Sequence, residues 1–258
     1  MATVEEHTTG APCWIELFAA DPDLVLPFYG ELFGWQAEPP REEFGGYINV
    51  STADGRRLAG CMKNDGSAGA PDGWSIYLRT ENAEQLAEDA VSNGGAVMVP
   101  AMEVMDLGSM VVVADAGQAA IGAWQPGTHR GYEAHGEPGA PVWFELHTRD
   151  YDASVAFYRD VFGWNTTHVE GDTPDFRYTT LGTADDSLAG IMDATAFLPE
   201  GVPAHWSIYF QVDDADAALA KVTELGGSVV MAVEDTPYGR LATATDPGGN
   251  TFKLMQPT

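Results

Sequence analysis

The chain has few basic residues and a large excess of acidic ones. Among its 258 residues, 39 are Asp or Glu and 12 are Lys or Arg, of which only three are lysine, so the formal net charge is -27. Such a surface repels phosphate backbones and anionic lipid, so we expect neither nucleic acid nor a membrane as a partner. The even spread of the acidic residues is typical of a solvated surface rather than of one site for a cationic ligand.

Cysteines and long apolar runs are also scarce. Cys13 and Cys61 are the only cysteines, and their spacing fits neither a zinc site nor a disulfide scaffold, so we expect reduced thiols without a nucleophilic role. No apolar run reaches 18 residues, and the opening MATVEEHTTG lacks the basic and apolar parts of a secretory signal. We therefore expect a cytoplasmic globular protein. P-loop, dinucleotide-binding, GxSxG and HExxH motifs are all missing from the sequence.

The sequence does contain a long internal repeat. WIELFAADPDLVLPFYGELFGW (14–35) returns as WFELHTRDYDASVAFYRDVFGW (143–164), with ten of 22 positions identical. WSIYLRT (74–80) and WSIYFQV (206–212) correspond in the same way, and the offset stays near 130 residues along the chain. A near-constant offset indicates duplication of a whole domain. The predicted division is a flexible N-terminal tail (1–10), a first domain (11–126), a linker (127–140) and a second domain (141–258).

Each half contains a smaller repeating unit. CWIELFA alternates like a strand, and residues 22–33 have apolar residues at helical spacing, with Asp21-Pro22 as a helix start and Gly34 as a stop. Short strand patterns follow at 45–51 and 56–63. The series then restarts with a strand at 74–80, a helix at 82–92 and three further strands. Each half is therefore predicted to hold two βαβββ modules, and the chain four.

These features resemble the vicinal oxygen chelate superfamily, which includes glyoxalases, bleomycin resistance proteins and extradiol dioxygenases. The resemblance rests on FYxxxFGW at 28–35 and 157–164, on the GG that closes each second helix, and on DPGGNTFKLMQP at 246–257. The two-domain form looks like the actinobacterial proteins described as hydroxylase-like or glyoxalase-like. The resemblance implies an α+β fold in which tandem domains form two cup-like half-barrels with helices outside.

The resemblance also implies where a divalent metal would bind. In catalytic members of the superfamily, His and Glu from the first and last strands of the modules hold it. The corresponding positions here are Trp14 or Trp143, Gly60 or Gly190, Ser75 or Ser207, and Gly122 or Lys253. None of these is His, Asp or Glu, which are the usual non-thiol ligands of a catalytic divalent ion. We therefore expect no metal and no cofactor.

Strand alternation predicts which side chains line the cups instead. If Trp14 points inward, Glu16 does too, about 7 Å along the strand, and the same holds for Trp143 and Glu145. The catalytic candidates are Glu145, Glu16, His147, Tyr209 and Lys253. The ligand-binding candidates are Trp14, Trp143, Ser75, Tyr77, Arg79, Trp124, His205, Ser207 and Gln211. Aromatic walls of this kind suit a flat organic ligand. His129 and His135, in the linker, are expected to be exposed.

A carboxylate in an apolar cup must be paired, hydrogen-bonded or protonated. One interpretation is an ion pair in each half, Glu16 with Arg79 and Glu145 with Lys253. The other is a carboxylate with a raised pKa that acts as a general base or accepts a hydrogen bond from a ligand. The second half is the stronger candidate because more polar side chains could converge on its glutamate.

Two hypotheses about function follow. The first is a metal-independent enzyme of proton-transfer chemistry, such as cyclisation, aldol or lyase reaction, or isomerisation, acting on a planar carbonyl or phenolic compound, for example a polyketide. The alternative is a drug- or metabolite-binding protein that sequesters such a compound without catalysis. A metal-dependent lyase or dioxygenase is a third and weaker hypothesis. We expect a small-molecule ligand as the partner and a monomer or homodimer as the assembly.

Overall fold

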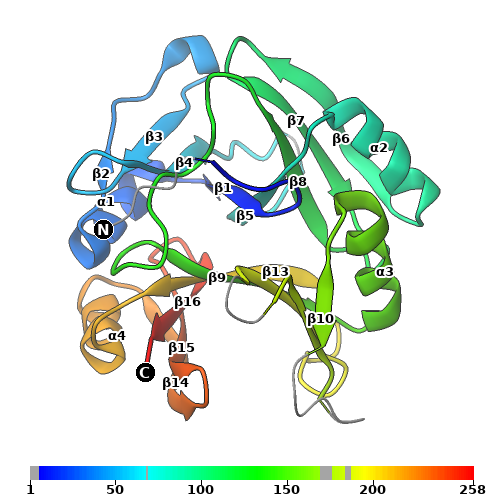
Figure 1. The fold of residues 1–258 in the computed structure, drawn as a ribbon. Coiled ribbons are helices and arrows are strands. Elements are labelled where there is room, and N and C mark those ends of the chain that lie inside the picture. Colours follow the sequence, from blue (N-terminus) through cyan, green and yellow to red (C-terminus); the bar gives the residue numbers. More distant parts are fainter. Residues whose placement is uncertain (1–5, 68, 169–175, 184–186) are drawn as a thin grey trace.

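The computed structural model describes residues 6–67, 69–168, 176–183 and 187–258 and consists of two eight-stranded sheets with four α-helices (Figure 1). The strand order is β2-β3-β4-β1-β5-β8-β7-β6 in one sheet and β10-β11-β12-β9-β13-β16-β15-β14 in the other. Each sheet is thus built from the two modules of one half. The predicted α+β fold of four βαβββ modules is confirmed.

The elements of the first half are β1 (Pro12–Ala19), α1 (Pro22–Phe33), β2 (Gln36–Ala37), a 3₁₀ turn (Glu42–Phe44), β3 (Ile48–Ser51), β4 (Arg57–Lys63), β5 (Gly73–Arg79), α2 (Ala83–Ser92), β6 (Ala96–Val104), β7 (Gly108–Ala114) and β8 (Ala120–Pro126). Those of the second half are β9 (Pro141–Thr148), α3 (Tyr151–Phe162), β10 (Thr166–His168), β11 (Tyr178–Leu181), β12 (Ala189–Asp193), β13 (His205–Gln211), α4 (Ala215–Glu224), β14 (Ser228–Thr236), β15 (Gly239–Thr245) and β16 (Thr251–Gln256).

The first helix of each half ends as its sequence predicts. Gly34 and Gly163 follow α1 and α3 in the left-handed conformation, and their N–H groups donate to carbonyls four and five residues back. Glycine adopts this conformation without the steric cost that a Cβ brings. The second helices are capped at the other end, because Asn82 and Asp214 accept hydrogen bonds from backbone N–H groups of α2 and α4.

The helices associate across the two halves. α1 of the first half lies beside α4 of the second, and α3 of the second lies beside α2 of the first (Figure 1). Strand β5 also contacts β13, so the outer faces of the two sheets pack against each other at the centre of the molecule. The core is therefore continuous between the halves, and the other face of each sheet remains free to form a cup.

The repeated FYxxxFGW motif forms this junction. The Tyr29 hydroxyl donates to Asp246 Oδ2 in the other half at 3.1 Å, and the Tyr158 hydroxyl donates to Asp115 Oδ2 at 3.0 Å. The indole N–H of Trp35 donates to the carbonyl of Gly139 at 2.6 Å. The duplicated motif thus links each helix to the opposite half by buried aromatic packing and hydrogen bonds.

Residues on either side of the first domain pack against it. His7, in the predicted N-terminal tail, is buried, and its Nε2 lies 3.0 Å from the carbonyl oxygen of Tyr132. His129 and His135 are partly buried rather than exposed, because the linker lies against the first half. Residues 1–5 lie outside the described residues.

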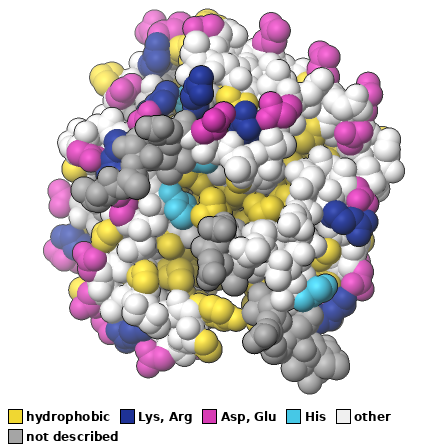
Figure 2. Space-filling model, in the orientation of Figure 1, with side chains coloured by type: hydrophobic (Ala, Val, Ile, Leu, Met, Phe, Trp, Pro, Cys, Tyr) yellow, Lys and Arg dark blue, Asp and Glu magenta, His cyan; other side chains and the backbone are white. Residues whose placement is uncertain are grey.

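The face of the molecule shown in Figure 2 has most of its charged side chains near the edge. Acidic side chains lie around its edge and hydrophobic side chains gather near its middle (Figure 2). Within the described residues, no helix is long and apolar enough to cross a membrane.

Candidate functional site

The second cup contains a cluster of polar side chains around Glu145. This residue lies on β9, one of the two central strands of its sheet, between β12 and β13. One carboxylate oxygen, Oε1, lies 2.7 Å from the Tyr209 hydroxyl, 2.8 Å from His147 Nε2 and 3.4 Å from Lys253 Nζ. These four residues are the second-half catalytic candidates of the sequence, and the structure brings all of them together. The predicted pairing of Glu145 with Lys253 is confirmed.

The neighbours of Glu145 hold it in the charged form. Burial alone would raise its pKa, but the hydrogen bond from His147, the charge of Lys253 and the hydrogen bond from Tyr209 hold the pKa well below its ordinary value. Of the two interpretations from the sequence, the ion pair with Lys253 therefore describes this carboxyl and the raised pKa does not. Glu145 is therefore an anchoring carboxylate and a poor proton acceptor.

Lys253 connects the members of the cluster. Its Nζ lies 2.9 Å from His147 Nε2 and donates to the Tyr209 hydroxyl at 2.8 Å. Burial lowers the pKa of Lys253, and the charge of Glu145 acts against this shift. The side chains of Lys253 and His147 remain 15% and 14% exposed, compared with 8% for Glu145. A ligand in the cup would therefore meet the lysine and the histidine before the glutamate.

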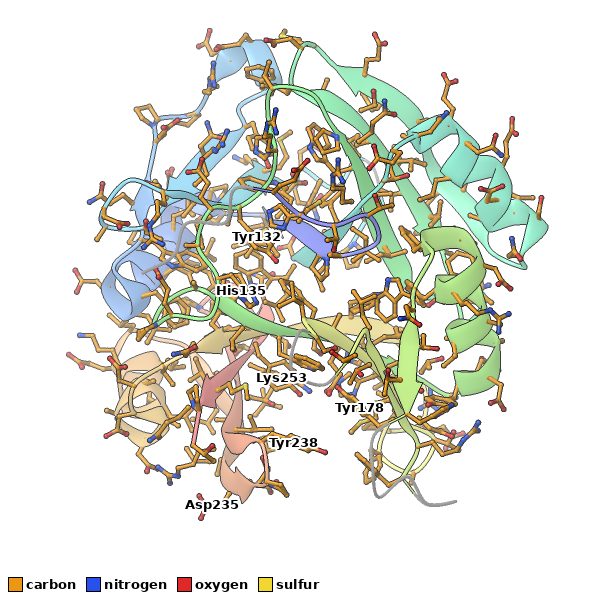
Figure 3. The ribbon with its side chains drawn as sticks, viewed as in Figure 1. Tyr132, His135, Tyr178, Asp235, Tyr238 and Lys253 are labelled. Carbon is orange, nitrogen blue, oxygen red and sulfur yellow. The ribbon has the colours of Figure 1, made fainter. Side chains whose placement is uncertain are left out.

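Tyr178 completes the cluster and was not foreseen from the sequence. Its hydroxyl donates to Glu145 Oε2 at 2.8 Å and accepts from the Trp143 indole N–H at 2.9 Å. Tyr178 and Lys253 both lie on the second-half sheet (Figure 3). A Cβ at Gly190, on the neighbouring strand, would collide with the tyrosine ring. The sequence contains a signal for this contact. Tyr47 and Tyr178 are equivalent in the repeat, and Gly60 and Gly190, also equivalent, have no side chain where the tyrosine rings lie.

The remaining second-half candidates occupy different places. His205 lies flat against His147, with ring centroids 5.2 Å apart and planes at 3°, and Ser207 faces Glu145 across the β9–β13 ladder. Gln211 lies outside the cluster. It follows the irregularity in strand pairing between Tyr209 and Phe210, and its side chain lines a groove at the junction of the halves.

The first cup has the same frame around Glu16. Tyr47 and Tyr77 hydrogen-bond to its carboxyl group, and the Trp14 indole N–H donates to the Tyr47 hydroxyl at 2.9 Å. Burial raises the pKa of Glu16 to about 7, although the two tyrosines act in the opposite direction. Ser75 lies opposite Glu16 on β5. Glu16, rather than Glu145, therefore has the raised pKa that the sequence suggested for one of them.

The predicted pairing of Glu16 with Arg79 is wrong. Arg79 is the last residue of β5. Its Nη1 lies 2.9 Å from Glu81 Oε1, and its Nη2 lies 3.9 Å from Glu6 Oε1. At this edge the guanidinium retains partial hydration and has acidic partners, which a position in the cup would not provide. Arg79 is therefore not part of the first cup.

Two positions in the repeat separate the two cups, because Phe18 stands at the position of His147 and Gly122 at that of Lys253. Gly122 of β8 corresponds to Lys253 of β16, since they lie opposite Tyr77 and Tyr209 respectively. A Cβ at Gly122 would collide with the ring of Tyr77, so the first cup has no room for a lysine there. Its glutamate consequently has tyrosine partners and no cation, whereas the second cup has a charged pair.

His129 of the linker packs against the tryptophans of the first cup. Its ring lies edge-on to Trp14, with centroids 4.4 Å apart, and to Trp124 at 5.5 Å. The Trp124 indole N–H donates to the His129 carbonyl at 2.8 Å. Burial lowers the pKa of His129 to about 4. The linker therefore covers the aromatic wall that was predicted to bind a ligand, and Trp14 and Trp124 are 6% and 9% exposed.

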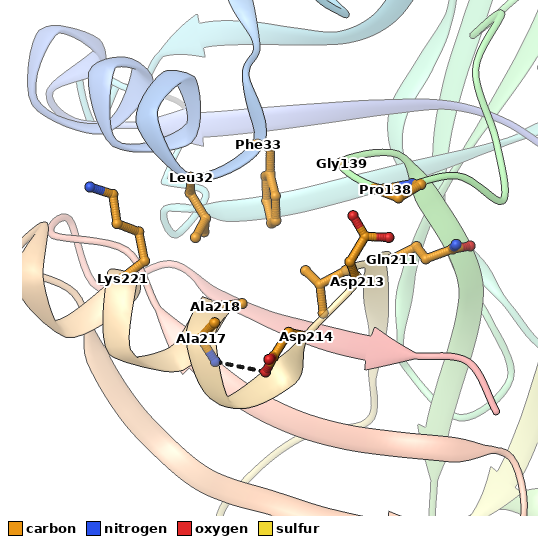
Figure 4. Close-up of a pocket in the computed structure, with 11 residues that line it drawn as sticks. Leu32, Phe33, Pro138, Gly139, Gln211, Asp213, Asp214, Ala217, Ala218 and Lys221 are labelled. Carbon is orange, nitrogen blue, oxygen red and sulfur yellow. Dashed lines mark hydrogen bonds between the residues drawn. The ribbon is translucent and has the colours of Figure 1, made fainter.

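A separate groove of about 340 Å³ lies away from both glutamates. It is bounded by the end of α1, the linker and the start of α4 (Figure 4). Leu32 and Phe33 supply an apolar side, and Asp213 and Lys221 supply charge. Asp214 in its wall accepts the hydrogen bond that caps α4. Its polar groups do not converge on one point, in contrast to those around Glu145.

The residues of the second cup do not fit a divalent metal ion. The ammonium group of Lys253 lies 3.4 Å from Glu145 Oε1 and would repel a second cation. Across the described ranges there is no group of three or more His, Cys, Asp and Glu placed to hold one.

Cys13 and Cys61 are free and buried, and burial raises the pKa of both thiols.

Comparison with known proteins agrees with this architecture. The model of the Glyoxalase/Bleomycin resistance protein/Dioxygenase superfamily matches residues 140–254. A protein of Mycobacterium tuberculosis named as a glyoxylase, CFP32, is 34% identical over 98% of this chain and 97% of its own. The chain belongs to this superfamily. The anthracycline biosynthesis protein DnrV of Streptomyces peucetius is 30% identical over 96% of this chain and 93% of its own.

Solved structures of superfamily members share the fold. The 2,3-dioxygenase LapB from Pseudomonas sp. KL28 superposes with a TM-score of 0.64 at 15% identity, over 95% of this chain and 91% of its own. The Mn(II)-bound glyoxalase from Novosphingobium aromaticivorans gives 0.66 at 14% identity, over 96% and 82%. Family membership and these relatives support a small-molecule enzyme or binding role for the chain.

Proposed function

We propose that the second cup is the active site of a metal-independent enzyme that moves protons on a planar carbonyl or phenolic compound. The observation that carries this proposal is the contact of Lys253 Nζ with His147 Nε2 and the Tyr209 hydroxyl, at 2.9 and 2.8 Å, above an ionised Glu145. The homologues named for anthracycline biosynthesis support a polycyclic aromatic ketone as the substrate class.

The residues of the second cup would have different roles in this reaction. Lys253 would donate a hydrogen bond to the oxygen that becomes negative when an enolate or phenolate forms. The Tyr209 hydroxyl, which donates to Glu145 Oε1 and accepts from Lys253 Nζ, would hold the lysine in place. His147, partly exposed beside them, would accept and return the proton, which is the usual role of a positioned histidine. Glu145 would hold all three in place. His147, and not Glu145, is the base in this scheme, because Glu145 is ion-paired and both of its carboxylate oxygens accept hydrogen bonds.

Hydrogen exchange on a simple aromatic ketone tests the proposal. We expect the protein, after treatment with a chelator, to accelerate exchange of the C2 hydrogens of 8-hydroxy-1-tetralone in D₂O, followed by NMR. His147→Ala and Lys253→Met should each lower the acceleration at least ~100-fold, the lower range for a general acid or base. Glu16→Gln, in the first cup, is the matched control and should retain it.

The outcomes separate the hypotheses. Acceleration that depends on His147 and Lys253 supports the enzyme. A protein that binds the ketone while exchange stays at the buffer rate is a binding protein, and the proposal is then wrong. Exchange that disappears with the chelator and returns with Mn²⁺ would instead indicate metal-dependent chemistry.

A further inference from the structure

Lys253 has surroundings that neither of the other two lysines shares. Its Nζ is within 3.4 Å of a carboxylate, an imidazole nitrogen and a phenol hydroxyl. Lys63 is exposed at the end of β4, and Lys221 is 35% exposed beside Glu224 on α4. The chain thus contains one lysine among acid and base groups and two ordinary surface lysines for comparison.

The three groups around Lys253 match what an amine needs to attack a carbonyl carbon. The amine must first lose a proton, and His147 Nε2, 2.9 Å away, can accept it when the imidazole carries its own proton on Nδ1. The imidazolium formed would face Glu145 Oε1 at 2.8 Å, where the ionised carboxylate stabilises its charge. Burial lowers the pKa of the lysine, which favours the neutral amine.

We propose that Lys253 forms an imine with the carbonyl group of an aldehyde or ketone ligand. This inference rests on the proposed function and specifies its substrate class, since it requires a carbonyl carbon within reach of Nζ. A phenol without a carbonyl group would not react in this way, although it could still bind through the same hydrogen-bond donors.

The reaction balances with the groups present. The ammonium of Lys253 transfers a proton to His147, and the Nζ lone pair forms a bond to the carbonyl carbon. A proton then moves from the nitrogen of the adduct to the carbonyl oxygen, which gives a neutral carbinolamine. His147 returns its proton to the carbinolamine hydroxyl, which leaves as water while the carbon–nitrogen double bond forms. One carbonyl compound and one ammonium group give one protonated imine and one water, and nothing is oxidised or reduced.

The Tyr209 hydroxyl has a positioning role in this scheme. It accepts from Lys253 Nζ at 2.8 Å and donates to Glu145 Oε1 at 2.7 Å, so it fixes the direction in which the amine points. His205 has a similar effect on the second partner, because its ring lies flat against that of His147. Both contacts would limit the rotation of the groups that exchange the proton.

Reductive trapping tests the proposal directly. The full chain is incubated at near-neutral pH with 4-hydroxybenzaldehyde and cyanoborohydride, which reduces an imine to a stable secondary amine, and the sites are mapped by peptide mass spectrometry. We expect Lys253 to be labelled at least tenfold faster than Lys63 and Lys221, although it is the least exposed. His147→Ala should slow labelling of Lys253 and leave the other two unchanged.

Labelling that follows exposure, with Lys63 and Lys221 ahead of Lys253, would overturn the proposal. The same holds if His147→Ala changes nothing while its circular dichroism shows a folded protein. The two measurements on wild type separate this inference from the proposed function. If wild type accelerates hydrogen exchange on the tetralone and shows no trapped adduct, the imine is wrong and the proton-transfer site stands. A trapped adduct without exchange would mean that the imine forms and that the proton-transfer function is wrong.

Discussion

At the residue scale, the two glutamates show how identical positions acquire opposite properties. Glu145 faces a lysine and a histidine and has a lowered pKa, whereas Glu16 faces tyrosines alone and has a pKa raised to about 7. The difference begins at Lys253 and its counterpart Gly122, where the ring of Tyr77 fills the space. The replacement of Lys253 by Gly122 and of His147 by Phe18 therefore decides which cup can hold a charged cluster.

The raised pKa of Glu16 makes stability depend on pH. The folded protein binds this proton more tightly than the unfolded chain, so the stabilisation is present below pH 4.5 and declines as the pH rises towards about 7. The shift corresponds to ~3 kcal/mol. We expect the unfolding free energy of wild type, minus that of Glu16→Gln, to fall by this order between pH 4.5 and 8 in urea titrations. A difference independent of pH would contradict the assignment.

Sequence alternation identified the cup residues but not their partners. It placed Glu16, Glu145, His147 and Tyr209 on inner faces, because the period of a strand is two. It could not supply Tyr47, just before β3, or Tyr178 on β11, because each reaches its glutamate over a glycine of the intervening strand. It also misplaced Arg79 and Gln211, since at the end of a strand nearby charges and irregular pairing decide where a side chain points.

At the element scale, the first helix of each half is fixed by the opposite half. The Tyr158 hydroxyl on α3 donates to buried Asp115 and accepts from the Trp206 indole N–H at 2.8 Å. Tyr29 on α1 has the same pair of partners, Asp246 and Trp74. The interpretation of FYxxxFGW as helix and core foresaw buried aromatics, but a single sequence did not indicate that they pack across halves.

Removing either tyrosine hydroxyl should destabilise the protein. Tyr29→Phe and Tyr158→Phe each leave a buried carboxylate and an indole N–H with one partner fewer, and we expect a loss of ~1–3 kcal/mol in the free energy of unfolding by urea. Tyr238→Phe, at a tyrosine that is 56% exposed, is the matched control and should change little. Equal stability of all three variants would mean that the cross-half hydrogen bonds do not contribute.

At the scale of the whole molecule, two cups with a common frame have different surroundings. The linker places His129 against Trp14 and Trp124 in the first cup, while the second cup leaves Lys253 and His147 partly exposed. Duplication of the domain was plain in the sequence because the offset is nearly constant. The sequence did not indicate that the linker covers the first cup, because the linker has the composition of an exposed loop.

Because the first helix of each half packs against the second helix of the other half, we expect neither half to be stable alone. Separate expression of 1–126 or 127–258 would expose the aromatic faces of α1 and α3, each large apolar side chain costing ~1.5–3 kcal/mol when it is returned to water. We expect each half to lack a cooperative unfolding transition in near-ultraviolet circular dichroism. Mixing the two halves should restore the transition. A cooperative transition in either half by itself would contradict this account of the core.

Binding of a planar phenolic ketone tests most directly the claim that the second cup is the functional one. Wild type, Lys253→Met and Glu16→Gln are titrated with 1,8-dihydroxyanthraquinone, and its visible absorption is followed as the phenol becomes phenolate. We predict one molecule bound per chain with a red-shifted spectrum in wild type and Glu16→Gln, and loss of that shift in Lys253→Met. Loss of binding in Glu16→Gln but not in Lys253→Met, or no binding to wild type, would contradict the claim.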